Sequence, residues 1–254
     1  MRVALLGPEG TYTHQAAKKY FGDFEPDFCS TIREVFKSDT ETKFVPVENS
    51  LGGGVSDTVD LLRDNGNKVT AEVVLSIEHA LISDSGLEEI ETVKSHPQAL
   101  AQSEEIISEH GWDKVETDST AKAVEDLNEN EAALASEIAA EINNKPIVRT
   151  SVQDKENNTT RFFVLNGEPE PEEKTSMMLE PGEDRPGLLH SMLSCFAGHQ
   201  VNLSHIQSRP TKNKLGEYYF YVEAEAADDR MDKSIKCLET YADVKILGKF
   251  SRVE

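Results

Sequence analysis

Residues 2–21, RVALLGPEGTYTHQAAKKYF, carry the pattern from which the fold can be worked out. Residues 2–6 form a short apolar run typical of a strand, and residues 7–11 have the composition of a tight turn. Residues 12–21 then have the composition and spacing of a helix. The segment therefore predicts a strand, a tight turn and a helix in succession.

The same alternation continues along the chain. Strands are expected at residues 43–47, 69–81 and 93–95, and helices at 55–65, 98–109, 120–127 and 132–143. Residues 132–135 are wholly apolar and could equally form a buried strand, because periodicity alone does not separate the two. Alternating strands and helices predict an α/β fold with helices covering a mostly parallel sheet. Ligands of such folds bind beyond the carboxyl ends of the strands.

The composition changes at residues 167–174, Gly-Glu-Pro-Glu-Pro-Glu-Glu-Lys, which predict an exposed linker and a domain boundary. Beyond it, strands are expected at 176–179, 201–208, 218–224 and 244–250, and helices at 187–197 and 231–241. This order, βαββαβ, is the ferredoxin-like arrangement. Two unequal domains are therefore expected.

Composition and charge exclude several classes of function. Hydrophobic residues make up 37% of the 254 residues and charged residues 29%, which is typical of a folded globular protein. No apolar run approaches the roughly 20 residues that a membrane-spanning helix needs. The net charge of -21, from 47 acidic and 26 basic residues, argues against nucleic-acid binding, which requires a basic surface. An acidic, solvated surface is the simpler interpretation.

The amino terminus and the cysteines predict a cytoplasmic location. The first residues lack the apolar core and the cleavage site of a secretory signal. Cys29, Cys195 and Cys237 are odd in number and widely spaced, with no CxxC pair or neighbouring histidine cluster to suggest zinc. A reducing compartment and no structural metal are expected.

Polar clusters follow several of the expected strands. The turn at residues 7–11 could hold an anion at a helix start, although taken alone it is more often only a turn. Residues 47–54 place three consecutive glycines after Glu-Asn-Ser, which suits close approach of the backbone to a ligand. A flexible surface loop is the alternative for this segment, and the apolar strand before it favours a cleft.

Three further clusters have similar alternatives. His96, next to Ser95, could be a structural or surface histidine, and Asp118 with its neighbours could be a helix cap. Residues 158–162, Asn-Thr-Thr-Arg-Phe, place Arg161 before an apolar run, where its guanidinium could clamp a carboxylate or lie on the surface. Known protease, nucleotide and nicotinamide motifs do not occur in the sequence.

Together, in this order, the clusters resemble the prephenate dehydratase family over nearly the entire chain. The resemblance rests on Gly-Pro-Glu-Gly-Thr at 7–11, Val-Glu-Asn-Ser at 47–50, the Ser-His-Pro-Gln start of residues 95–102, Asp-Ser-Thr at 118–120 and Asn-x-Thr-Arg-Phe at 158–162. Asp118 stands where the family usually has Glu. In the C-terminal part, residues 187–190 and 207–210 are similar to the two phenylalanine-binding motifs of an ACT domain, with Leu188 in place of Ala and Gln207 in place of Glu.

The resemblance implies a two-lobed catalytic domain similar to type 2 periplasmic binding proteins, followed by a ferredoxin-like ACT regulatory domain. The implied catalytic domain is 1–168, with lobe 1 at 1–76 and 149–168 and lobe 2 at 77–148, and the ACT domain is 175–254. The implied reaction is the decarboxylating dehydration of prephenate to phenylpyruvate, a hydro-lyase activity that requires no metal or organic cofactor. Phenylalanine is the implied allosteric effector, and a homodimer or dimer of dimers the implied assembly.

The resemblance also suggests roles for individual residues. Thr160 is expected to assist departure of the ring hydroxyl, which requires a relay because Thr is a weak acid. Arg161 is expected to clamp a carboxylate or to orient Thr160. The residues expected to bind or surround the substrate are Thr11, Glu48, Asn49, Ser50, Ser95, Gln102, Asp118, Ser119, Thr120 and Phe162. Those expected to bind the effector are Gly187, Leu188, Leu189, Asn202, Leu203, Gln207, Ser208 and Arg209.

Two rival interpretations remain at this stage. Arogenate dehydratase acts on the aminated analogue of prephenate, and no residue distinguishes the keto from the amino side chain. A non-catalytic amino-acid sensor with the same domains is a different class of protein. The cluster Thr160, Arg161 and Phe162 argues against the sensor.

Overall fold

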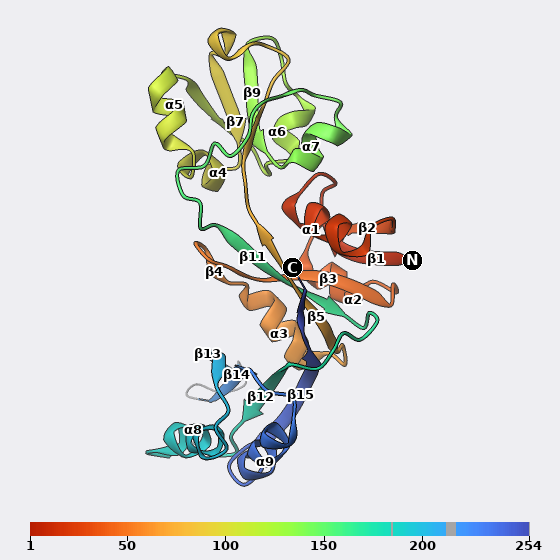
Figure 1. Cartoon of the computed structure of the whole chain (residues 1–254), viewed down its shortest axis with the longest axis vertical. Coiled ribbons are helices and arrows are strands. Elements are labelled where there is room, and N and C mark those ends of the chain that lie inside the picture. Colours follow the sequence, from red (N-terminus) through yellow and green to blue (C-terminus); the bar gives the residue numbers. More distant parts are fainter. Residues whose placement is uncertain (184, 212–216, 254) are drawn as a thin grey trace. The chain divides into compact units, whose positions relative to one another are not determined.

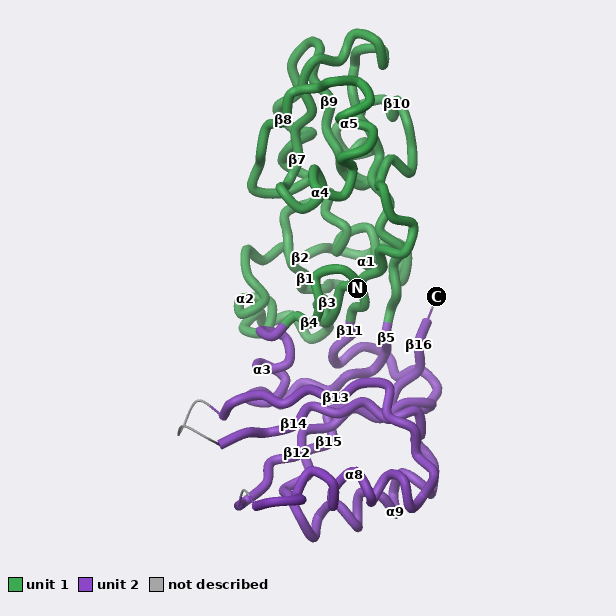
Figure 2. Tube along the Cα trace, turned by 90° about the vertical axis from the view of Figure 1, so that its left-hand side faces the viewer, with its two compact units in different colours: residues 1–55, 73–162, 254 green, residues 56–72, 163–253 purple. Residues whose placement is uncertain are grey.

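The computed structural model of the chain describes residues 1–183, 185–211 and 217–253. The chain divides into two compact units, shown in different colours in Figure 2. Unit 1 contains residues 1–55 and 73–162, and unit 2 contains residues 56–72 and 163–253. Strands β5 (Val69–Ser76) and β11 (Thr159–Leu165) run from one unit into the other. Among the described residues, no helix is both long and apolar enough to span a membrane.

Unit 1 begins as the sequence predicts. β1 (Arg2–Leu6) is buried at its three central residues and pairs in parallel with β2 (Glu25–Cys29) and β3 (Thr42–Asn49). The sheet has the order β16-β5-β11-β3-β1-β2, in which β16 and parts of β5 and β11 belong to unit 2, and β4 (Gly53–Gly54) pairs with β3. The helices α1 (Tyr12–Phe21) and α2 (Ile32–Lys37) each start at a threonine whose hydroxyl accepts a backbone N–H of the first turn, which satisfies an otherwise unpaired donor.

A second sheet of unit 1 has the order β10-β6-β9-β7-β8. Its outer helices pack onto a core that contains Leu81, Val93, Ile107 and Leu134. Figure 1 shows β7 and β9 between α5 and the pair α6 and α7. The elements are β6 (Ala80–Ile82), η1 (Leu87–Glu89), β7 (Thr92–Ser95), α4 (Pro97–Ala101), α5 (Glu104–His110), β8 (Asp113–Glu116), α6 (Lys122–Glu125), β9 (Glu131–Ala135), α7 (Glu137–Ile142) and β10 (Ile147–Arg149).

Unit 2 contains the expected βαββαβ element. Its antiparallel sheet has the order β13-β14-β12-β15, and α8 and α9 lie side by side on one face of it (Figure 1). The core between sheet and helices contains Met177, Met192, Phe196 and Met231. The elements are α3 (Ser56–Asp64), β12 (Lys174–Glu180), α8 (Leu188–Gly198), β13 (Leu203–Pro210), β14 (Tyr218–Ala224), α9 (Asp229–Leu238), β15 (Asp243–Phe250) and β16 (Arg252–Val253). The predicted fold class, mixed α/β with a ferredoxin-like domain, is thus confirmed.

Several predicted elements are wrong in detail. The helix expected at 98–109 is two helices, because the chain breaks at Gln102 and Ser103. Of the two alternatives for residues 132–135, the buried strand is the correct one, because they lie in β9, which is buried from Ala132 onward. Lys174, placed in the linker by its neighbours, is the first residue of β12, and its Nζ lies 2.5 Å from a carboxylate oxygen of the buried Glu72. A charge that is paired inside the protein does not mark a linker.

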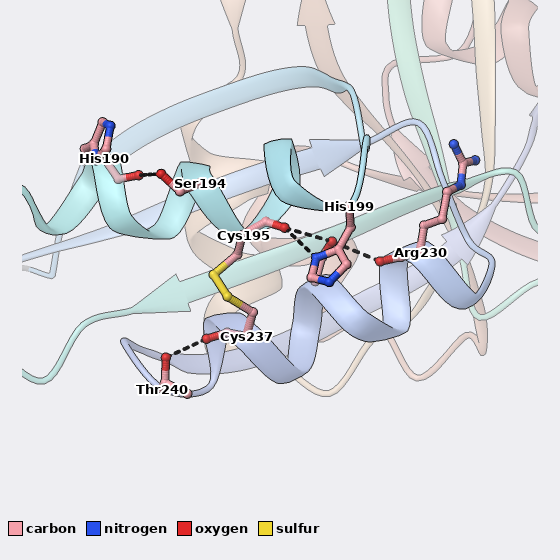
Figure 3. Close-up of a disulfide and its surroundings, with 8 residues drawn as sticks. His190, Ser194, Cys195, His199, Arg230, Cys237 and Thr240 are labelled. Carbon is pink, nitrogen blue, oxygen red and sulfur yellow. Dashed lines mark hydrogen bonds between the residues drawn. A yellow bond between two sulfur atoms is a disulfide. The ribbon is translucent and has the colours of Figure 1, made fainter.

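The structure joins two of the three cysteines, which their spacing does not predict. Cys195 on α8 and Cys237 on α9 form a disulfide across 42 residues of chain (Figure 3). Cys29 is a free thiol on β2. The bond ties together the two helices that cover the sheet of unit 2.

Candidate active site and effector site

Unit 1 contains a cavity of about 350 Å³ whose walls come from both of its sheets. Five of the predicted substrate and catalytic residues line it: Asn49, Gln102, Thr120, Thr160 and Phe162. The other lining residues are Tyr12, Thr13, Pro46, Gly52, Gly53, Gly54, Val55, Ile77, His79, His96, Gln98, Ala99 and Asn158. None of these described residues is an Asp, Glu, Lys or Arg. The cavity is therefore built from uncharged hydrogen-bonding groups, two histidines and apolar side chains.

The glycine-rich turn after β3 is fastened to β11 rather than loose. The backbone N–H of Ser50 donates to Thr159 O (2.9 Å). The Ser50 hydroxyl donates to Asn157 O (2.8 Å) and accepts from Thr159 N–H (2.9 Å). Gly53 has φ +80°, a region that favours glycine. The cleft interpretation of this turn thus fits the geometry. Ser50 links the turn to β11 and is not among the described residues that line the cavity.

Asn49 connects the turn to Thr160. Its Oδ1 accepts the backbone N–H groups of Leu51 (3.0 Å) and Gly52 (2.8 Å), so its Nδ2 must point the other way. Nδ2 donates to Thr160 Oγ1 (3.0 Å) and to Asn158 Oδ1 (2.8 Å). Because the Thr160 oxygen accepts from Asn49, its own hydrogen remains for a group in the cavity.

Arg161 pairs with Glu48. Its NH1 lies 2.7 Å from Glu48 Oε2, and the Arg161 side chain is 15% exposed. Neither residue belongs to the described cavity lining. This pair joins β11 to β3 directly beside Thr160. Phe162, on the same strand, stacks on Phe44 with ring centroids 5.0 Å apart and forms part of the apolar wall.

On the side of the second sheet, the cavity wall is formed by the start of α4 and the segment before α6. His96 caps α4, its Nδ1 accepting Gln98 N–H (3.2 Å), and both line the cavity. Ser95 is fully buried, and its hydroxyl donates to Leu134 O (2.6 Å), which is a structural role. Asp118 has an 86% exposed side chain paired with Lys122. Ser119 accepts Lys122 N–H at the start of α6. Thr120 alone of this cluster reaches the cavity.

The first turn of the chain is also held by side chains. Thr11 Oγ1 accepts His14 N–H (3.4 Å), and Gly10 N–H donates to His14 Nδ1 (3.2 Å). Ser136 donates its hydroxyl to Gly10 O (2.6 Å). Burial lowers the pKa of His14, which favours the neutral ring that can accept from Gly10. Thr11 thus caps α1, and its neighbours Tyr12 and Thr13 line the cavity.

Among the lining residues to which the sequence interpretation gave no role, Asn158, Tyr12 and His79 stand out because they share hydrogen bonds inside the cavity. Asn158 belongs to the quoted Asn-x-Thr-Arg-Phe motif, so a signal for it existed. Tyr12 and His79 had none, because a tyrosine at a helix start and a single histidine in a mostly apolar segment are common structural features. His79 is 2% exposed, and burial lowers its pKa.

Unit 2 contains a larger cavity of about 550 Å³. Four of the predicted effector residues line it: Gly187, Leu188, Leu189 and Ser208. The side chain of Asn202 bonds Glu225 (2.6 Å), whereas Leu203 and Gln207 lie along β13. Arg209 directs its guanidinium to α3, where it bonds Asp60 (2.9 and 3.1 Å) and Ser56 (2.7 Å).

Comparisons with known proteins agree on the family. The family model for prephenate dehydratase matches residues 3–170, and that for the ACT domain matches residues 182–230. A prephenate dehydratase of Methanocaldococcus jannaschii is 38% identical over 260 residues, which cover 96% of this chain and 95% of that protein.

Two solved structures share the fold. A prephenate dehydratase from Arthrobacter aurescens in complex with L-Phe has a TM-score of 0.88 and 28% identity, and the match covers 99% of this chain and 90% of that one. A protein described as GqqA, a novel type of quorum-quenching acylase, has a TM-score of 0.91 and 26% identity, with coverage of 100% and 98%. A shared fold does not by itself fix a reaction. The family model and the relative do so, and the chain belongs to the prephenate dehydratase family, with a C-terminal ACT domain.

Proposed function

We propose that the cavity of unit 1 is where this prephenate dehydratase converts prephenate to phenylpyruvate, carbon dioxide and water. The observation that carries the proposal is Thr160, whose hydroxyl lines the cavity while its oxygen accepts from Asn49 Nδ2 (3.0 Å). Such a hydroxyl has its hydrogen free for a leaving group. The reaction is a step in the synthesis of phenylalanine.

The chemistry asks little of the protein beyond placement. Breaking the bond from the ring to the carboxylate carbon releases carbon dioxide, and the electron pair enters the ring as the C–OH bond breaks. The hydroxide departs as water once it gains a proton, and the ring becomes aromatic. The enzyme must hold the dianion, donate to the departing oxygen and leave the departing carboxylate poorly solvated. The apolar wall with Phe162 and Ile77 suits the last requirement.

Roles for the predicted residues follow from where each lies. We assign Thr160 to the departing hydroxyl, and Asn49, Gln102 and Thr120 to the substrate's polar groups. Arg161 and Glu48 hold the β3 and β11 ends that present Asn49 and Thr160. The remaining predicted residues are assigned to supporting the walls: Thr11, Ser50, Ser95, Asp118 and Ser119.

Phenylalanine control is proposed to act through the cavity of unit 2. The structure from Arthrobacter aurescens named above is a complex with L-Phe, and the ACT family model matches here. Leu188 lines the cavity where the family usually has the smaller Ala, so a weaker or altered fit for phenylalanine is expected. For this role we retain 175–254 as the regulatory domain and 1–168 as the catalytic one, with its lobes dividing near residues 77 and 148.

A homodimer or dimer of dimers is proposed from the sheet edge. β13 is an outer strand of its sheet, and its Ile206 is 43% exposed. Pairing with a second copy would cover both the edge and the apolar side chain. Light scattering coupled to size exclusion measures this, and a monomer at assay concentrations would overturn it.

A cytoplasmic location is proposed from the substrate. Prephenate carries two carboxylates and does not cross a bilayer unaided. The enzyme must therefore act in the compartment where prephenate is made, which we take to be the cytoplasm.

The decisive experiment follows phenylpyruvate by its absorbance in alkali. Wild type should form it from prephenate, Thr160→Ser should keep measurable activity, and Thr160→Ala should lose about 10²- to 10⁴-fold in kcat while remaining folded. A near-normal kcat in Thr160→Ala would remove Thr160 from the role. Parallel assays with arogenate measure the phenylalanine that it would yield. Comparing kcat/KM for the two compounds decides which one is the substrate.

Added phenylalanine tests the second domain in the same assay. Suppressed product would support control through unit 2, and isothermal titration without binding would dismiss it. Absence of product from either substrate would instead favour the non-catalytic sensor.

A further inference from the structure

A continuous chain of side-chain hydrogen bonds runs from Thr160 to two residues without an assigned role, His79 and Tyr12. Asn158 Nδ2 donates to Gln102 Oε1 (3.0 Å), and His79 Nε2 lies 3.0 Å from the same oxygen. Tyr12 Oη lies 2.5 Å from His79 Nδ1. All of these residues line the cavity of unit 1.

The direction of every bond in this chain follows from two backbone groups. Leu51 and Gly52 N–H fix Asn49 Oδ1, so Asn49 Nδ2 faces Asn158 Oδ1. Asn158 must then turn its Nδ2 to Gln102, which must present Oε1. An acceptor at that position requires a hydrogen on the facing ring nitrogen, His79 Nε2.

The remaining nitrogen of His79 is consequently an acceptor. A neutral imidazole with hydrogen on Nε2 has a lone pair on Nδ1, and the Tyr12 hydroxyl is placed to donate to it. The backbone oxygen of Glu78 is a second acceptor for this hydroxyl at 3.1 Å, and the contact with Nδ1 is the shorter one. The Tyr12 and His79 rings also touch, with centroids 5.6 Å apart. His79 lies 2% exposed between β5 and β6, where the chain passes from the first sheet of unit 1 to the second.

We propose that Tyr12 and His79 are positioning residues: they hold Gln102 and Asn158, and through Asn49 the hydroxyl of Thr160, in the orientation that donates to the leaving group. The chain contains amides, which do not readily pass protons, so it orients Thr160 and does not supply a proton to it. The proposal rests on the assignment of Thr160 above.

Two substitutions of His79 separate the effect of losing its hydrogen-bond donor from the effect of losing its side-chain volume. In His79→Gln the side-chain amide reaches the position of Nε2 and can still donate to Gln102, whereas in His79→Asn the amide reaches only the position of Nδ1. We expect His79→Asn to lose about 10-fold in kcat with little change in KM, because misplacement affects the reacting geometry. His79→Gln should recover most of that loss. Tyr12→Phe, which keeps the ring, should show a smaller loss in kcat.

A double variant distinguishes orientation from general damage to the fold. If His79 acts through Thr160, adding His79→Asn to Thr160→Ala should have almost no further effect on kcat, because the two act as one unit. Independent, additive losses would overturn the proposal. His110→Asn is the matched control, since His110 stacks on Trp112 away from the cavity and should leave kcat unchanged.

The outcomes separate this proposal from the function on which it rests. Normal kcat in Thr160→Ala would remove the Thr160 assignment itself. A large loss in Thr160→Ala together with a normal His79→Asn would overturn only the role of His79 and Tyr12. Equal losses in His79→Asn and His79→Gln, or a loss that appears in KM alone, would also overturn it. Unfolding midpoints in urea, measured for each variant, identify losses due to instability.

Discussion

Both the oxygen and the nitrogen of the Asn49 side-chain amide make hydrogen bonds. Replacing either atom should therefore change activity. The oxygen holds the glycine turn and the nitrogen donates to Thr160. Asn49→Asp keeps the shape and the accepting oxygen but replaces the donor with a negative charge. We expect kcat/KM for prephenate to fall by about 10²-fold or more, because a carboxylate would face both the Thr160 oxygen and a dianionic substrate.

Asn49→Ala is the comparison that isolates the charge. It removes the donor without adding repulsion, so its KM for prephenate should be lower than that of Asn49→Asp. Steady-state kinetics of both variants at one ionic strength test the difference. Equal KM values would show that the charge at this position is not felt by the substrate.

Glu72 is a second residue whose environment determines its effect, here on stability. Its side chain is fully buried and pairs with Lys174 (2.5 Å) and Arg252 (2.7 Å) within unit 2. Glu72→Ala removes the nearer carboxylate from Lys174. The Lys174 amine then keeps its longer contact with the Glu223 carboxylate, at 3.7 Å. We expect a loss of about 3 kcal/mol in the free energy of unfolding, measured by urea denaturation.

The control for Glu72 is an ion pair of the same kind on the surface. Lys18 and Glu141 lie 3.1 Å apart with side chains 49% and 69% exposed. Water screens such a pair, so Glu141→Ala should hardly change the unfolding midpoint. Similar losses in both variants would show that burial is not what makes the Glu72 pair important.

At the same scale, the site was only partly predictable. Asn49, Gln102, Thr120, Thr160 and Phe162 follow motifs, and all five line the cavity. Asp118 and Ser95 belong to equally clear motifs yet point to solvent and into the core, because a motif places the backbone and not each side chain. His79 depends on contacts with residues 12 and 102, and a sequence has no local signal for such a contact.

Elements were predictable where local and tertiary preferences agree. α1 spans the predicted residues because Thr11 caps it and its apolar residues recur at helical spacing. β2 and α2 were not predicted, because β2 has the mixed sequence Glu-Pro-Asp-Phe-Cys and is formed by pairing with β1. The strand β9 was left open between helix and strand, and only its position beside β6 and β7 decides it.

The helix pair of unit 2 offers a prediction at the scale of elements. The Cys195–Cys237 bond closes a loop of 42 residues between α8 and α9. Closing a loop of this length restricts the unfolded chain and stabilises the folded state by about 3–4 kcal/mol. Reduction with dithiothreitol should therefore lower the thermal midpoint of the wild-type protein. Because reducing compartments keep such bonds rare, the form inside a cytoplasm is expected to be the dithiol.

The matched control removes the bond and keeps the other sulfur atoms. Cys237→Ser should have the lower midpoint from the outset and should not respond to dithiothreitol. Thiol titration of unfolded, unreduced wild type should find only Cys29, whereas all three cysteines should react after reduction. Three reactive thiols without reduction would mean that the purified protein lacks the bond.

For the whole molecule, net charge and the charge at the site have to be considered together. The chain carries -21, while the described residues that line the catalytic cavity are neutral or histidine. Prephenate is a dianion, so its approach is opposed by the field of the whole surface and is not aided by a fixed cation among those lining residues. Salt screens such a field over a Debye length of about 10 Å at 0.1 M.

We therefore expect kcat/KM for prephenate to rise with ionic strength, mainly through a lower KM, because kcat concerns a substrate already bound. Steady-state kinetics across a KCl series measure the slope. A variant with Glu88, Glu109 and Glu129 changed to Gln removes three negative charges from exposed positions and should have a higher kcat/KM at low salt and a shallower slope. A flat or falling profile for wild type would mean that local positive potential already dominates the approach. If the Glu-to-Gln variant has the same salt slope as wild type, the salt effect comes from the protein's stability and not from its surface charge. Unfolding curves at each salt concentration would show such a change in stability.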